Sequence, residues 1–117
     1  MNTLTIIFAA LVALEHLYIM VLETFATDSK ATSRTFNMDK STLNDKNIAT
    51  LFKNQGVYNG LLAVLIGVAL WQDDLLWTRL LLGYVILVAA YGSMTSNPKI
   101  ILKQGGLAII AMICSWI

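Results

Sequence analysis

The sequence predicts an all-α integral membrane protein, a four-helix transmembrane bundle that forms a single domain over residues 1–117. Composition is the first observation: hydrophobic residues make up 57% of the chain and charged residues 13%, whereas about 25% of an average soluble protein is charged. A soluble domain of this size could not bury so much apolar surface. The second observation is that the apolar residues gather in four segments, at about 4–26, 54–71, 75–95 and 99–117.

The first segment, Leu4–Ala26, is long enough to cross a bilayer but contains three ionisable residues, Glu15, His16 and Glu23. A charge at the centre of a span costs roughly 2.5–3.5 kcal/mol, so their presence needs a reason. At about 100° per residue, all three lie within an arc of about 100° on the helix. Because lipid cannot solvate such a stripe, it must face protein or a water-filled cavity. The segment lacks a basic start and a cleavage site, so we expect a retained span rather than a signal peptide.

The second segment opens with polar residues before it becomes apolar. Gln55, Tyr58 and Asn59 share one face of the predicted helix. Gly56 and Gly60 form a GxxxG pattern, which lets a neighbouring helix approach closely. One option is therefore a homodimer through Gly56 and Gly60.

The third and fourth segments carry fewer polar groups. Tyr84 and Tyr91 lie on the third, which ends at Asn97-Pro98 because the residue before proline is pushed out of the α region. Gln104 lies near the start of the fourth segment, which is barely long enough to span about 30 Å of hydrocarbon at about 1.5 Å per residue.

Residues 27–53 are the only long polar stretch. Within it, Ser41–Asn44 is a candidate cap for a short amphipathic helix that runs to Phe52. We expect that helix to lie on the cytoplasmic surface of the membrane.

The cationic residues predict the orientation of the bundle. Five of the eight Lys and Arg residues lie in the 27–53 loop, and Lys99 and Lys103 lie at the third loop; only Arg79 lies on the opposite side. The positive-inside rule then places both of these loops in the cytoplasm and both termini outside. This N-out/C-out arrangement predicts a multi-pass protein of the plasma membrane.

Three motifs resemble those of a known family. Residues 14–19 read LEHLYI, residues 22–25 read LETF and residues 54–60 read NQGVYNG. They are similar to motifs of the small bacterial integral membrane family called domain of unknown function 1304, where the second motif reads LEMF and the third NQGLYNG. This chain departs at Thr24 and Val57, and Leu107 stands where proline is usual after the Gln-Gly pair of the last helix. The resemblance implies a four-span membrane protein and no established activity.

With this topology, the polar groups of every helix lie in the same half of the bilayer. We therefore predict one polar pocket that opens toward the cytoplasm and binds a small lipophilic or amphipathic molecule. Glu15, His16 and Glu23 are the candidate catalytic residues for proton-transfer (isomerase or epimerase) chemistry, since histidine changes its charge near neutral pH. The candidate ligand-binding residues are Gln55, Tyr58, Asn59, Tyr84, Tyr91 and Gln104.

Several alternatives remain open at this stage. The polar stripe could be a structural network that fixes helix register, the chain could be a proton-coupled transporter of small molecules, or it could be a subunit of a membrane complex. Whether the protein is an enzyme is also open. No metal and no cofactor are expected, because Glu15 and Glu23 lie about 12 Å apart along the helix axis and cannot share one ion. No basic, aromatic-interleaved patch points to nucleic acid.

Overall fold

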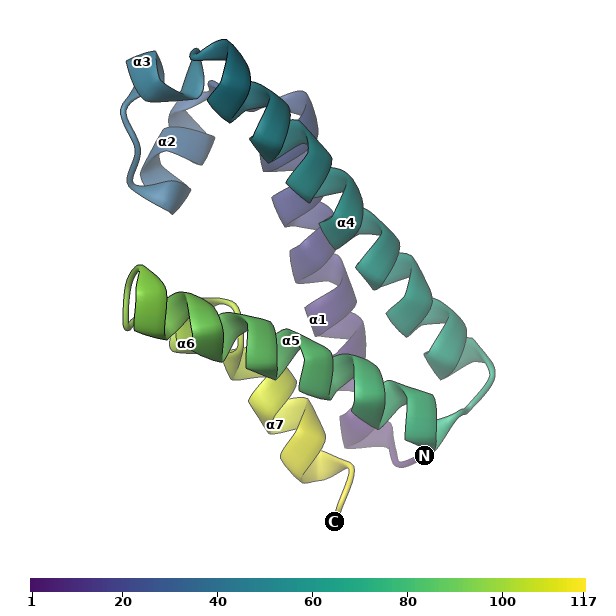
Figure 1. Ribbon diagram of the computed structural model, residues 1–117. Coiled ribbons are helices and arrows are strands. Elements are labelled where there is room, and N and C mark those ends of the chain that lie inside the picture. The colour runs from purple at the N-terminus through teal and green to yellow at the C-terminus, as the bar shows by residue number, and fades with distance from the viewer. The chain divides into compact units, whose positions relative to one another are not determined.

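The computed structural model describes residues 1–117 and consists of helices joined by short turns (Figure 1), which confirms the all-α prediction. In chain order the elements are α1 (Thr3–Met20), η1 (Val21–Phe25), α2 (Lys30–Phe36), α3 (Lys40–Leu43), α4 (Lys46–Trp71), α5 (Leu75–Thr95), α6 (Ile100–Lys103) and α7 (Gly106–Cys114). Three stretches are long and apolar enough to cross a membrane: Thr3–Phe25, Lys46–Trp71 and Leu75–Thr95. This helix composition is that of a membrane protein.

The chain packs as two compact units. One comprises Met1–Ala13 and Val64–Ile117, and the other comprises Leu14–Ala63. Helices α1 and α4 each contribute residues to both units.

The last apolar segment differs from the prediction of a fourth unbroken span. It divides into α6 and the nine-residue α7, which at about 1.5 Å per residue is too short to cross a bilayer alone. The break is at Gln104 and Gly105, and Gly105 has φ −99° and ψ −14°, away from ideal α values. Two consecutive glycines weaken a helix, which explains why the helix can break here. As a result, three helices rather than four are long and apolar enough to span a membrane.

This last segment nevertheless runs back along α5 (Figure 1). At its start the N–H of Ile101 donates to Ser93 Oγ at 2.7 Å. At its end Arg79 donates from Nη2 to the carbonyl of Ser115 at 2.6 Å and from Nε to Ser115 Oγ at 3.1 Å, and its guanidinium lies 3.5 Å from the ring centroid of Trp116. Arg79 is therefore held at the C-terminal end of α7, where a cation is favoured.

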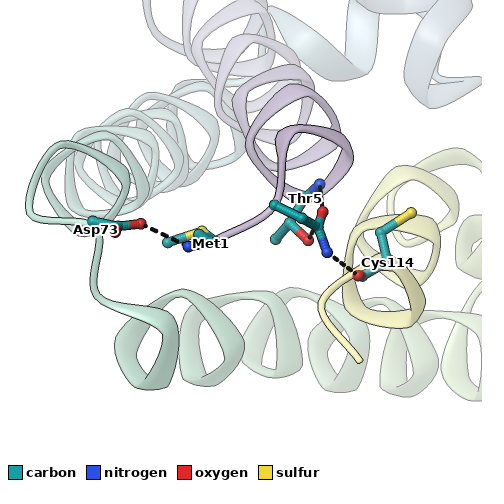
Figure 2. Close-up of polar contacts among 5 residues, drawn as sticks. Met1, Thr5, Asp73 and Cys114 are labelled. Carbon is teal, nitrogen blue, oxygen red and sulfur yellow. Dashed lines mark hydrogen bonds and ion pairs between the residues drawn. The ribbon is translucent and has the colours of Figure 1, made fainter. Parts of the chain in front are cut away.

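The start of α1 joins the same unit through polar contacts (Figure 2). Asn2 Nδ2 donates to the carbonyl of Cys114 at 2.8 Å, while Asn2 Oδ1 accepts from the N–H and the hydroxyl of Thr5, both at 2.8 Å. The Met1 ammonium lies 3.2 Å from the carboxylate of Asp73. The contacts of Asn2 supply partners to backbone groups at the N-terminal end of α1 and the C-terminal end of α7, where a helix leaves such groups unpaired.

The region before the second span also differs in its boundaries. The helix expected from Ser41–Asn44 to Phe52 is divided: α3 ends at Leu43, and α4 begins at Lys46 rather than near residue 54. Asp45 is the reason, because its carboxylate accepts from the N–H groups of Asn47 and Ile48 at 3.0 and 3.1 Å and so starts a new helix. Helix α2, which precedes this region, was not predicted from the sequence.

The two adjacent glycines of the last segment give a matched test of its packing. A Cβ on Gly105 would lie 3.1 Å from Ala89 Cβ and 2.7 Å from the carbonyl oxygen of Ile101, whereas one on Gly106 would meet nothing within 4 Å. We expect Gly105→Ala to lower the free energy of unfolding by about 1–3 kcal/mol through overpacking. Gly106→Ala should leave it unchanged or raise it by up to about 1 kcal/mol. Chemical unfolding in detergent, followed by circular dichroism, measures both; equal effects would contradict this packing.

Candidate functional site

The unit formed by Leu14–Ala63 holds most of the predicted site residues. Glu15 and His16 lie on α1, and Glu23 lies in η1. Three more lie on α4: Gln55, Tyr58 and Asn59.

Glu23 lies in a π-turn that the sequence did not predict. η1 continues α1 with wider hydrogen bonding, and its closing bond runs from the N–H of Ala26 to the carbonyl of Val21 at 2.9 Å. Single π-turns are rare and are found frequently at functional sites. Glu23 itself is only 5% exposed, so its carboxylate depends on protein partners.

The partner of Glu23 is Asn59. The amide Nδ2 of Asn59 donates to Glu23 Oε1 at 2.6 Å, a charge-assisted geometry when the carboxyl group is ionised. The two residues are far apart in the chain, and the bond joins η1 to α4. The structure therefore brings together one predicted catalytic residue and one predicted ligand-binding residue.

Close packing at two glycines makes this bond possible. A Cβ on Gly56 would clash with Thr24 Oγ1 and would lie 3.0 Å from the backbone nitrogen of Thr24, and one on Gly60 would clash with Met20 Sδ. The hydroxyl of Thr24 also donates to the carbonyl of Lys53 at 3.0 Å. The GxxxG pattern thus packs against the first helix of the same chain. A homodimer through these glycines stays a prediction, and it would require the two helices to separate here.

Glu15 and His16 lie on α1, before Glu23 in the chain. His16 is 5% exposed. One carboxyl oxygen of Glu15, Oε1, is buried and has no hydrogen-bond partner. An unsatisfied buried polar group costs about 1–3 kcal/mol, and each one in a native structure calls for an explanation. The other such side-chain atom is Thr78 Oγ1, which belongs to the other unit.

The remaining predicted ligand-binding residues are not gathered around these carboxyl groups by any hydrogen bond. Gln55 is exposed, and Tyr58 is 71% exposed. Tyr84 and Tyr91 are 57% and 69% exposed and belong to the other unit, as does the half-buried Gln104. Their role in ligand binding stays a prediction. No group of three or more His, Cys, Asp or Glu side chains converges in the structure.

Two threonines that the sequence analysis passed over close the end of the first span. The hydroxyl of Thr27 donates to the carbonyl of Glu23 at 2.7 Å, and that of Thr32 lies 2.6 Å from the carbonyl of Ala26 and 3.0 Å from that of Leu22. Both threonines are buried. The carbonyls of Leu22 and Glu23 lie in the last turn, which a helix end leaves without backbone partners, while that of Ala26 also accepts from the N–H of Ser29 at 3.1 Å. Hydroxyl residues directly after an apolar span are the signal that could have found them.

Comparison with known proteins places this arrangement in a family. The family model described as "Protein of unknown function (DUF1304)" matches residues 10–116. The chain belongs to the DUF1304 family. This confirms the resemblance predicted from the LEHLYI, LETF and NQGVYNG motifs. The chain is also 59% identical to "Uncharacterized protein YpaA" of Lactococcus lactis subsp. lactis (strain IL1403), over 99% of each protein. No solved structure matches the chain.

The threonine contacts predict a large difference between two similar substitutions. Thr32→Val removes the hydroxyl that satisfies buried carbonyls and should lower the free energy of unfolding by about 1–3 kcal/mol. Thr35→Val, three residues later on the exposed side of α2, should change it by less than about 0.5 kcal/mol. Thermal unfolding in detergent compares the two; similar losses would show that the Thr32 hydroxyl does not carry this role.

The Glu23–Asn59 bond predicts a non-additive pair. Asn59→Leu leaves the buried Glu23 carboxyl group without its donor and should cost about 1–3 kcal/mol of unfolding free energy, whereas the double variant Glu23→Leu/Asn59→Leu should recover most of that loss. Asn54→Leu, at an exposed position of α4, is the control. A double-mutant cycle by chemical unfolding measures the coupling, and additive effects would contradict the bond.

Proposed function

We propose that the chain is a single-domain, multi-pass protein of the plasma membrane that crosses it four times, with the fourth crossing made by the broken segment α6–α7. The support is that this segment runs back along α5 from Ser93 to Arg79, a length of about 21 Å at about 1.5 Å per residue. Broken helices are tolerated at membrane depth where they are buried against protein.

The charges support an N-out/C-out orientation. Residues 27–53 hold five of the eight Lys and Arg residues. Lys99 and Lys103 follow the C-terminal end of α5. If the three candidate spans all cross the membrane, that end lies on the same side as residues 27–53. The positive-inside rule assigns that side to the cytoplasm. On this proposal α2, α3 and the first turns of α4 lie at the cytoplasmic surface, in place of the amphipathic helix predicted there.

We infer that the protein binds a small lipophilic or amphipathic molecule beside Glu15. The observation that carries this is the buried Glu15 Oε1 without a partner. Natural proteins rarely keep such a group unless it serves a function, and an ionisable residue inside a membrane span is functional by default. A ligand with a hydroxyl or amine group would supply the missing hydrogen bond, and a span surrounded by hydrocarbon favours a ligand that is otherwise apolar.

His16 and Glu23 extend this proposal to acid–base chemistry. His16 is buried next to Glu15 in the chain, and Glu23 is held in place by Asn59. In a ligand with an acidic C–H bond beside a carbonyl group, the Glu15 carboxylate would take that proton and leave an enolate, and protonated His16 would give a proton to another position of the enolate. Proton exchange with water would then restore both side chains, so the net reaction is an isomerisation. Ligand binding has to be tested before catalysis, because the proposed isomerisation requires a bound ligand.

The test uses the purified full chain and the variants Glu15→Leu, Glu15→Gln and Asp28→Asn, the last an exposed carboxylate as control. Organic extraction and mass spectrometry should find a co-purifying molecule in the wild type and in Asp28→Asn, reduced about tenfold or more in Glu15→Leu. The stripped Glu15→Leu protein should be more stable than the stripped wild type by about 1–3 kcal/mol, because an unsatisfied buried group has been removed. If Glu15→Leu is less stable and no molecule is found in any sample, Glu15 is structural.

A further inference from the structure

A hollow separate from the buried carboxyl groups lies in the polar region between the first two candidate spans. Helix α2, the turn after it and the start of α3 line an open hollow of about 450 Å³, within the about 300–1,000 Å³ range of small-molecule sites. Its lining residues are Ser29, Lys30, Ser33, Arg34, Asn37, Met38, Asp39 and Lys40. Asn37, between the two helices, has a left-handed backbone (φ 53°) that asparagine tolerates well. This turn folds the chain so that residues of both helices line one hollow.

Hydrogen bonds within the segment hold the wall of this hollow. Ser29 Oγ accepts from the N–H of Thr32 at 3.2 Å, and the hydroxyl of Ser33 donates to the carbonyl of Met38. Both serines line the hollow. Its shape is therefore set by contacts that do not use the charged side chains.

The charges around the hollow are mostly positive. Lys30, Arg34 and Lys40 line it together with one anion, Asp39. None of the four takes part in a salt bridge, because the one ion pair in the structure joins Met1 and Asp73. The hollow therefore has three unpaired cations and an excess of two positive charges, and it is suited to a phosphate group, which lysine and arginine bind well.

The position of the hollow along the chain favours a membrane source for that phosphate. Residue 29 follows the end of the first candidate span, Phe25, by four residues, and residue 40 precedes the start of the second, Lys46, by six. In the topology proposed above, on which this inference rests, a short segment held between two span ends would lie at the level of the lipid head groups. We propose that the hollow between α2 and α3 binds the phosphate-bearing head group of an anionic membrane lipid.

The experiment titrates the full chain in neutral detergent with phosphatidylglycerol, and with phosphatidylcholine of the same acyl chains, by native mass spectrometry. One variant is Lys30→Gln/Arg34→Gln/Lys40→Gln. Its matched control, Lys46→Gln/Lys99→Gln/Lys103→Gln, removes the same charge at exposed positions outside the hollow. Because each cation near an anionic lipid strengthens its binding, the first variant should bind phosphatidylglycerol about tenfold or more weakly, and the control should stay within about threefold of wild type.

Two further measurements test the role of charge in the hollow and distinguish a lipid head group from a soluble phosphate. Asp39→Asn removes the one anion of the hollow, so it should strengthen binding of phosphatidylglycerol while leaving the fold intact by circular dichroism. Millimolar inorganic phosphate should compete poorly with the lipid. Equal losses in the two triple variants, or no preference over phosphatidylcholine, would overturn the proposal. Full competition by inorganic phosphate would overturn it in favour of a soluble phosphate ligand.

Discussion

The polar contacts of the Leu14–Ala63 unit depend on one steric condition: α4 has no side chain at residue 56. Gly56 lies so close to Thr24 that a Cβ would clash with it, and at this distance a side chain as short as Asn59 reaches the carboxyl group of Glu23. In a soluble protein water could complete a longer bond, but hydrocarbon supplies no such partner. The small residue and the polar pair are therefore parts of one arrangement, in which packing brings the donor to the acceptor and the bond offsets the burial of the acid.

The same requirement explains how the first span ends. A helix end leaves carbonyl groups without partners, and here buried hydroxyl groups from Thr27 and Thr32 meet them. In the other unit, side chains also meet carbonyl groups at the C-terminal end of α7: Arg79 donates to the carbonyl of Ser115 and Asn2 to that of Cys114. The C-terminal ends of the first span and of α7 are thus closed by side chains of the chain itself. The one side-chain atom near the predicted site that is not satisfied in this way, Glu15 Oε1, stands out for that reason.

Much of the fold followed from the sequence, because long apolar runs have few alternatives in a membrane. Together α1 and η1 cover Thr3–Phe25, close to the predicted 4–26, and α5 covers Leu75–Thr95 as predicted. The start of α4 was missed because it depends on local capping by Asp45, which periodicity does not report. The break at Gln104 and Gly105 was missed because an apolar run does not show where two consecutive glycines interrupt the helix. For the site, the energetic cost of charge predicted that His16 and Glu23 are buried. The helical wheel placed Gln55 and Tyr58 beside Asn59, but only Asn59 reaches a carboxyl group, since the contact face is narrower than the polar arc. Helix packing decides which residues of a polar helix face contact the neighbouring helix.

The π-turn at Val21–Phe25 has a consequence for how related sequences are compared. A π-turn uses about one residue more than an α-turn to make the same advance, so it is equivalent to a single-residue insertion absorbed inside a continuous helix. A relative that lacks that residue could keep every apolar position of the span yet present its last turn rotated by about 100°. Its acidic residue would then face a different neighbour. Conservation of chain length across this turn is therefore as informative about the Glu23–Asn59 pair as conservation of the two residues themselves.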